Sequence, residues 1–253
     1  HADLLGIQDY GREKMDYRQA GPNRNLATVS GTWAQKVSKD KLAFCIGLWS
    51  QYANPAGTGT GDAMNYEALL KLQPADTVFT PYLTTYLYAP GKPSGYVQRY
   101  NSLFETRRKA EYIKSYQFRG FFTWDITKDA VDSNYRRYSL LKMLDDWNSN
   151  PQQYAPVTGF TRQDYYSSSQ DIIGGFHSLT ASPDNWVGIY EFSTGNSIGY
   201  YQYLPNSSDG SFTIPASVVQ TLTQNKLYIL RFYNGAGGIG VNFLGTSHPF
   251  YKI

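Results

Sequence analysis

Residues 119–130 read RGFFTWDITKDA, and this stretch decides how the first half of the chain is interpreted. Two phenylalanines and a tryptophan favour a β-strand that packs in an apolar core. Acidic side chains rarely lie in such a strand, so we expect it to end at Trp124, just before Asp125. Because polar residues follow at once, Trp124 is expected at the rim; an ordinary core position is the alternative. Asp129 is expected to be a solvated loop residue.

The sequence before this strand alternates between strand and helix patterns. Residues 1–10, HADLLGIQDY, contain a short apolar strand that ends in polar residues. Residues 41–49, KLAFCIGLW, are almost continuously apolar, which is typical of a parallel strand covered on both faces. Ser102 and Glu105 have the spacing of a capping box at the start of a helix. This alternation predicts an α/β domain with parallel strands over residues 1–148.

The pattern changes at residues 149–159, which are rich in Pro, Asn and Gln and are expected to form a linker. In residues 160–253, short runs such as NWVGIYEF and KLYILRFYNG are separated by turn signals, which predicts an antiparallel β-sandwich. These runs resemble the small immunoglobulin-like modules of bacterial secreted proteins. Five aromatic residues here are candidates for a strip that faces a polysaccharide: Trp186, Tyr190, Tyr200, Tyr201 and Tyr203. The favoured alternative is that strand alternation places about half of them in the core and leaves the others simply exposed.

The composition argues against several classes of partner. Only 17% of the 253 residues are charged and the net charge is +3, without the basic cluster of a nucleic-acid-binding protein. No apolar run is long enough for a membrane span. His177 and His248 lack metal-ligand spacing, and the glycines of 57–62 are not part of a phosphate-binding motif, so neither metal nor cofactor is expected. The 23 tyrosines suit contact with sugars or proteins, because each combines a flat face with a polar tip.

Polar and aromatic side chains stand where each predicted strand ends. In α/β barrels the carboxyl ends of the strands form the active site. Amide, carboxyl, phenol and indole groups at one rim are typical of a sugar site, because aromatic faces stack on pyranose rings and planar polar groups bind hydroxyls. The candidate residues are Gln8, Asp9 and Tyr10 after the first strand, Trp49 after the second, and Trp124 and Asp125 after the third. For Trp49, an ordinary core position is an equal alternative.

These strands resemble strands six, seven and eight of family 18 glycoside hydrolases, the chitinases and their relatives. Gln8 and Tyr10 match the polar residue and tyrosine at the end of the sixth strand. Residues 41–47 match the seventh strand, and residues 120–125 match the glycine, apolar run, tryptophan and acid of the eighth. Many family members carry a small α+β insertion between the last two strands, which corresponds to about 62–101. The resemblance implies a partial (β/α)8 TIM barrel with that insertion.

The resemblance also implies a mechanism. In this family the substrate's own acetamido oxygen attacks the anomeric carbon, with retention of configuration. Tyr10 would be the catalytic tyrosine that hydrogen-bonds the acetamido carbonyl, and Trp124 would form the floor under the reacting sugar. Gln8, Asp9 and Trp49 would be substrate contacts. Asp125 would bind hydroxyls or simply cap the closing loop.

One family motif is absent from the chain. The general acid of the family is the glutamate of a D-x-D-x-E string on the fourth strand, and no such string occurs here. If the resemblance holds, the acid and strands one to five lie on a segment outside this chain, which would then be its partner in a closed barrel. Otherwise these strands form a smaller, complete α/β domain.

The sequence therefore predicts part of a secreted, chitinase-like glycoside hydrolase that acts on chitin or N-acetylglucosamine oligosaccharides, followed by an accessory β-sandwich. Whether the chain is an enzyme stays open, because the acid is not in it. The alternative is a non-catalytic carbohydrate-binding or toxin-complex component derived from a chitinase barrel. A two-domain structural protein is a third possibility.

Overall fold

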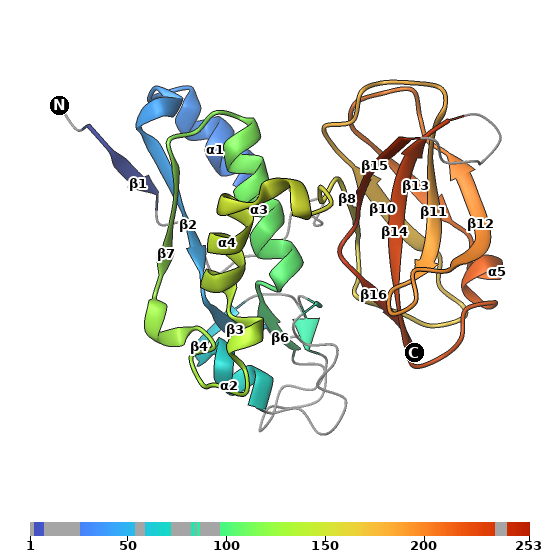
Figure 1. Cartoon of the computed structure of the whole chain (residues 1–253), viewed down its shortest axis with the longest axis horizontal. Helices are drawn as coiled ribbons and strands as arrows, with labels where there is room; N and C mark the ends of the chain where they lie inside the picture. The colour runs from blue at the N-terminus through green and yellow to red at the C-terminus, as the bar shows by residue number, and fades with distance from the viewer. Residues whose placement is uncertain are drawn as a thin grey trace. The chain divides into compact units, whose positions relative to one another are not determined.

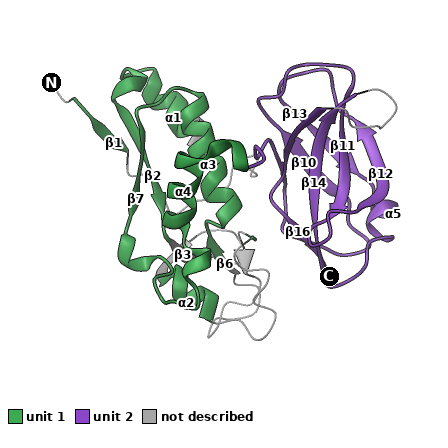
Figure 2. Cartoon of the chain, viewed as in Figure 1, with its two compact units in different colours: residues 1–153 green, residues 154–253 purple. Residues whose placement is uncertain are grey.

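The computed structural model describes residues 3–7, 26–53, 59–71, 82–83, 85–86, 97–235 and 242–253. The chain forms two compact units, His1–Gln153 and Tyr154–Ile253 (Figure 2). The division falls inside the stretch 149–159.

Unit 1 contains a three-stranded parallel sheet with the order β1-β2-β7. The strands are β1 (Leu5–Ile7), β2 (Leu42–Gly47) and β7 (Gly120–Trp124). Every residue of the central strand β2 is buried, as its unbroken apolar sequence requires, whereas the residues of β7 are half-buried and its last residue is exposed. Among the described residues, β1 and β7 each pair only with β2, so both edges of this sheet are open.

Outside the inserted sheet described below, the α-helices in the described part of unit 1 are α1 (Leu26–Ala34), α3 (Leu103–Ser115) and α4 (Leu140–Ser149). Helix α3 packs against β2, β7 and α4 (Figure 1). The Ser102 hydroxyl accepts a hydrogen bond from the Glu105 backbone N–H at 3.1 Å, so the predicted helix start is confirmed. Helix α4 buries one face, formed by Leu140, Met143, Leu144 and Trp147.

A small antiparallel sheet with the order β4-β3-β6-β5 is inserted between β2 and β7 in the sequence. Its elements are β3 (Trp49–Ala53), β4 (Gly59–Asn65), α2 (Tyr66–Lys71), β5 (Thr85–Tyr86) and β6 (Val97–Tyr100). The prediction of one strand over 41–49 is wrong at its carboxyl end. Strand β2 ends at Gly47, whose carbonyl oxygen accepts a hydrogen bond from the Asn101 side chain at 2.8 Å, and Trp49 opens the antiparallel sheet.

Unit 2 is built from two sheets that are mostly antiparallel. The three-stranded sheet has the order β13-β10-β8, from β8 (Gly159–Thr161), β10 (Ile172–Phe176) and β13 (Gly210–Ile214). The six-stranded sheet has the order β12-β11-β14-β16-β9, with β15 also pairing with β14. Its strands are β9 (Tyr165–Tyr166), β11 (Asn185–Glu191), β12 (Ser197–Tyr203), β14 (Lys226–Asn234), β15 (Asn242–Thr246) and β16 (Phe250–Lys252), and a short helix α5 (Ala216–Val219) precedes β14.

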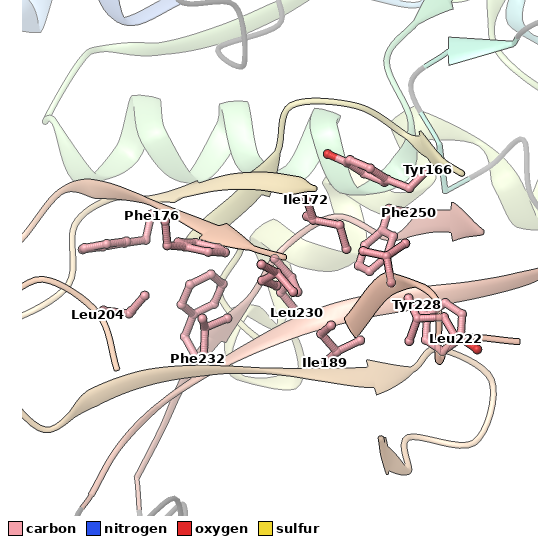
Figure 3. Close-up of a cluster of buried hydrophobic side chains, with 14 of the residues drawn as sticks. Tyr166, Ile172, Phe176, Ile189, Leu204, Leu222, Tyr228, Leu230, Phe232 and Phe250 are labelled. Atoms are coloured by element: carbon pink, nitrogen blue, oxygen red, sulfur yellow. The ribbon is translucent and has the colours of Figure 1, made fainter. Parts of the chain in front are cut away.

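The two sheets of unit 2 share one hydrophobic cluster (Figure 3). Ile172 and Ile214 come from the smaller sheet, and Ile189 and Leu230 from the larger one, and all are fully buried. A Cβ atom on Gly159 of β8 would lie 2.1 Å from the ring of Phe232 in β14, so the sheets meet where β8 has no side chain. The alternation of the sequence thus places apolar residues of both sheets in one core.

None of the helices in the described ranges is long and apolar enough to cross a membrane.

Candidate functional site

The candidate site lies at the carboxyl ends of the parallel strands of unit 1. Strand register places Gly47 of β2 opposite Trp124 of β7, and Cys45 opposite Phe122. Because side chains alternate along a strand, these four residues share one face of the sheet. Phe44 lies on the other face, where its ring meets the ring of Phe118 with centroids 4.9 Å apart.

Small residues on the shared face make room for the two large rings of β7. A Cβ atom on Gly6 of β1 would lie 3.3 Å from the Phe122 ring, although β2 separates these two strands. The Phe122 ring therefore crosses above β2, where the residues on this face are Ala43 and Cys45. Both are buried. The result is an apolar floor that ends at Trp124.

Trp124 stands at the rim of this floor. Trp124 is 51% exposed, whereas the four residues before it in β7 are half-buried. Its carbonyl oxygen accepts a hydrogen bond from the Leu48 backbone N–H at 3.0 Å, and the peptide bond to Asp125 is cis. The half-exposed indole offers a flat apolar surface to a ligand, as expected from the polar run that follows it.

Asp125 turns its carboxylate back on the loop that follows the strand. It accepts hydrogen bonds from the backbone N–H of Thr127, at 2.7 Å, and from the Thr127 hydroxyl. The Thr127 hydroxyl is the main reason why the pKa of Asp125 lies below its usual value. Asp125 therefore caps the short helix Ile126–Lys128, and its carboxyl is unsuited to donate a proton at neutral pH.

Asp129 corrects the prediction of a solvated loop residue, because it is 2% exposed. Its carboxylate accepts hydrogen bonds from the Ser139 hydroxyl at 2.6 Å and from the backbone N–H groups of Leu140 and Leu141 at 2.9 and 3.1 Å. These groups form the amino end of α4, where a negative charge is stabilised. Sequence reasoning missed this role because the cap comes from ten residues upstream, outside the local capping pattern.

Glu67 of the inserted helix α2 fixes the same loop from the other side. One of its oxygens accepts hydrogen bonds from the backbone N–H groups of Val131 and Asp132, each at 2.8 Å, and the other accepts from Lys71 at 2.5 Å. The Lys71 hydrogen bond is the main cause of the lowered pKa of Glu67. Three carboxylates thus anchor the loop after Trp124, one each at its start, its middle and its end.

A buried polar chain supports the carboxyl end of β2 on the helix side. Lys109 donates a hydrogen bond to Asn101 at 2.5 Å, and Asn101 donates to the Gly47 carbonyl. Glu105 lies 3.5 Å from the Lys109 ammonium and 2.7 Å from the Arg108 guanidinium. The four side chains are buried together, and the single carboxylate of Glu105 lies between the two cations Arg108 and Lys109. The capping pattern marked Glu105 only as a local contact, so the sequence did not reveal this network.

The structure places only part of the predicted site. Gln8, Asp9 and Tyr10 lie outside the described residues, so their predicted roles stay predictions. Trp49 opens β3, in the inserted sheet, and its side chain is not among those that the structure describes. Trp124 and Asp125 lie together at the end of β7. In the described part of the chain, no three His, Cys, Asp or Glu side chains cluster as metal ligands do.

Comparison with known proteins gives structural similarity alone. No protein-family model and no curated protein matches the chain. Similar solved structures are chitinases and chitinase-like proteins. Catalytic domain 2 of the Ostrinia furnacalis Group II chitinase is 13% identical, with a TM-score of 0.41 over 57% of this chain and 47% of that chain. The class V chitinase from Nicotiana tobaccum is 17% identical, with a TM-score of 0.32 over 46% and 38%.

A third similar structure is human YKL-39, which is described as a pseudo-chitinase with retained chitooligosaccharide binding properties. It is 12% identical to this chain, with a TM-score of 0.36 over 49% of this chain and 40% of that chain. The chain therefore spans less than half the length of each of these three structures.

Proposed function

We propose that unit 1 is the carboxyl-terminal part of the barrel of a chitinase-like glycoside hydrolase that cleaves β-1,4-linked N-acetylglucosamine polymers. The observation that carries the proposal is Trp124, a half-exposed indole at the carboxyl end of β7, beside an apolar floor of small residues. An aromatic face at this position suits the apolar face of a pyranose ring.

The order of the strands supports the same proposal. The three stretches that resemble strands six, seven and eight of family 18 contain β1, β2 and β7, which are adjacent and parallel in that order. The inserted antiparallel sheet lies between the last two of them. Among the described residues, the outer edges of β1 and β7 are unpaired, which fits a barrel that further strands complete, because unpaired strand edges are an aggregation hazard.

The proposed reaction follows the substrate-assisted retaining mechanism. The substrate's acetamido oxygen attacks the anomeric carbon, and Tyr10 hydrogen-bonds the acetamido carbonyl. Trp124 supports the reacting sugar, with Gln8, Asp9, Trp49 and Asp125 around it. A glutamic acid on a segment that is not in this chain protonates the leaving oxygen. This fits the lowered pKa values of Asp125 and Glu67, which leave neither carboxyl suited to that task.

The experiment that tests the proposal compares two sugars. The chain is titrated by calorimetry with tetra-N-acetylchitotetraose and with cellotetraose, which lacks the acetamido groups. The proposal predicts measurable binding of the first and weaker binding of the second. In the full-length gene product, Tyr10→Phe should lower the turnover of chitooligosaccharides while leaving their binding nearly intact. Equal affinity for the two sugars, or unchanged turnover, would contradict the proposal.

A second candidate function is non-catalytic binding of the same sugars, as a carbohydrate-binding or toxin-complex component. It is favoured by the absence of a D-x-D-x-E string from the sequence. The two functions differ in one observation: preferential binding of the acetylated sugar by a full-length gene product without hydrolysis would support the second.

We also propose that the protein is secreted, because its substrate is an extracellular polymer, and that unit 2 is an immunoglobulin-like β-sandwich accessory module. Two sheets around a shared apolar cluster support the latter part of this proposal.

A further inference from the structure

The outer face of the larger sheet of unit 2 carries a group of aromatic side chains. In β12, Ile198 and Tyr200 pack against the hydrophobic cluster of unit 2. Tyr201 and Tyr203 lie on the opposite, outer side of the strand, because side chains alternate. The outward rings come from four strands, β12, β11, β14 and β15, which lie side by side (Figure 1). We call this group the aromatic face; it consists of Trp186, Tyr190, Tyr201, Tyr203, Tyr233 and Phe243.

The rings of the aromatic face touch one another in a continuous series. Trp186 stacks on Tyr233 with centroids 4.6 Å apart and meets Tyr201 edge-on at 5.7 Å. Tyr203 lies 6.1 Å from Tyr201, and Phe243 lies 5.4 Å from Tyr233. Neighbouring rings at these distances hold each other in place, so the face is a rigid surface.

Three of these rings remain open to solvent although they are large and apolar. Tyr201, Tyr203 and Phe243 are 45%, 47% and 46% exposed. The remaining large hydrophobic residue that is exposed in the described part of unit 2 is Ile253, at the end of the chain. Exposed apolar residues scattered singly need no explanation, but a cluster on one sheet indicates a binding surface.

Glycines keep the surface between the rings flat. A Cβ atom on Gly188 would lie 3.2 Å from the rings of both Trp186 and Tyr190, so a side chain there would press against both rings. Gly199 of β12 has a φ of 82°, and the space above it is empty to 4 Å. A long, flat ligand can therefore lie along the sheet.

Arg231 of β14 is the charged residue that alternation places on the same side of the described sheet as the aromatic face. The Arg231 guanidinium lies 4.6 Å from the centroid of the Tyr190 ring. The pair of Glu191 and Lys226, 2.7 Å apart, belongs to the other side of the sheet, because these residues alternate in register with the core residues Ile189 and Tyr228. The described strands thus offer a charged ligand one charge, held over a ring, and otherwise uncharged side chains, so an uncharged occupant matches this surface best.

Trp186 supplies an independent sign of a polar ligand. Its side chain is 3% exposed, and its indole N–H finds no hydrogen-bond acceptor among the described residues. A buried donor without a partner is costly. Because this N–H is buried beneath the neighbouring rings, a ligand that carries hydroxyl groups can supply its acceptor only when these rings shift, whereas an aliphatic protein surface supplies none.

We propose that the aromatic face binds an uncharged, β-linked polysaccharide chain, with pyranose rings stacked on Tyr201, Tyr203 and Phe243. Such chains present flat C–H surfaces to aromatic rings and hydroxyl groups along their edges, which the tyrosine phenols and the Arg231 guanidinium can hydrogen-bond. The face lies on unit 2, and this inference does not depend on the function proposed for unit 1.

The test uses the full chain and insoluble chitin and cellulose as probes. Retention on each polymer is measured for the unaltered chain, for the double variant Tyr201→Ala/Tyr203→Ala, and for two single variants in unit 1, Trp124→Ala and Tyr116→Ala. We expect the double variant to lose roughly tenfold in affinity for at least one polymer, as removal of two stacking rings implies, while Tyr116→Ala behaves like the unaltered chain. Phe243→Ala, on a different strand, provides a second variant if the double variant does not fold.

The possible outcomes separate the two proposed sites. Loss of retention in Trp124→Ala but not in the double variant or Phe243→Ala would overturn the inference and leave the function of unit 1 standing. Loss in the double variant alone would support the inference and not the site in unit 1. Absence of retention of the unaltered chain would overturn the inference. A dimer in light scattering that the double variant converts to a monomer, without any polysaccharide binding, would identify a second copy as the occupant and would also overturn it.

Discussion

Replacing Asp129 by alanine tests whether the loop after Trp124 is anchored as the structure indicates. The carboxylate accepts three hydrogen bonds, at 2.6, 2.9 and 3.1 Å, and is 2% exposed. In Asp129→Ala, the backbone N–H groups of Leu140 and Leu141 lose their acceptor at the amino end of α4.

The magnitude follows from those lost bonds. A buried donor left unsatisfied costs about 1–3 kcal/mol, and loss of a helix cap costs about 1 kcal/mol. Since the contributions are not additive, we expect Asp129→Ala to lower the free energy of unfolding of unit 1 by about 3 kcal/mol, or roughly 150-fold in the equilibrium constant. Asp129→Asn keeps one acceptor oxygen and should cost about 1 kcal/mol.

Urea unfolding, followed by hydrogen exchange of the α4 amides as a local probe of unit 1, measures this effect. The matched control is Asp146→Ala in the same helix, which removes an exposed pair with Lys142 at 2.7 Å. Such pairs contribute less than about 0.5 kcal/mol. If Asp129→Ala costs no more than Asp146→Ala, the anchoring role of Asp129 is refuted.

Three further predictions concern single residues. The pKa of Glu67 is lower in the folded chain than its usual value, so the ionised carboxylate should stabilise the fold above the usual pKa, and this stabilisation should be lost as the pH falls through the folded pKa. In Glu67→Gln, hydrogen exchange of the Asp132 amide, which donates to Glu67, should depend less on pH in this acidic range. Burial raises the pKa of the Cys45 thiol to about 12, so a thiol reagent at pH 8 should label the chain only after unfolding; rapid labelling of the folded chain would contradict the buried position. Gly159→Ala places a Cβ 2.1 Å from the Phe232 ring, and we expect a loss of about 2 kcal/mol in the stability of unit 2; a thermal midpoint equal to that of the unaltered chain would contradict the close contact of the two sheets.

The local features of the fold could be predicted from the sequence because their causes are local. The apolar run of β2 and the Ser102 cap of α3 depend on residues close together in the chain. The rim position of Trp124 followed from the polar residues directly after it. Each of these features is set by burial or capping within one element, which is what sequence patterns report.

The contacts between distant segments could not be predicted. Asp129 and Glu67 have ordinary sequence surroundings, and their roles arise because the fold brings them to the amino end of α4 and to the loop at Val131. The end of β2 at Gly47 was missed for a similar reason: Leu48 and Trp49 continue the apolar pattern, but the strand stops where a side chain from residue 101 binds it. Tertiary hydrogen bonds override such local patterns.

The aromatic residues of unit 2 combine a local feature that could be predicted with distant contacts that could not. Alternation indicated that part of the set would face the core, and Tyr200 does pack against it while Tyr201 and Tyr203 are exposed. The sequence did not indicate that Tyr233 and Phe243, from distant strands, complete the face. Only the pairing of β14 with β11 and β15 brings them there.

The measurement that tests the central claim most directly is the affinity of Trp124→Ala for tetra-N-acetylchitotetraose, determined by titration calorimetry beside Tyr116→Ala. Tyr116 is also a large exposed aromatic residue of unit 1, 41% exposed, but it lies at the end of α3, before β7 begins. A sugar stacked on the indole predicts a loss of roughly tenfold or more for Trp124→Ala and no change for Tyr116→Ala. Equal affinities of both variants and the unaltered chain would contradict the account of the carboxyl end of β7 as a sugar site.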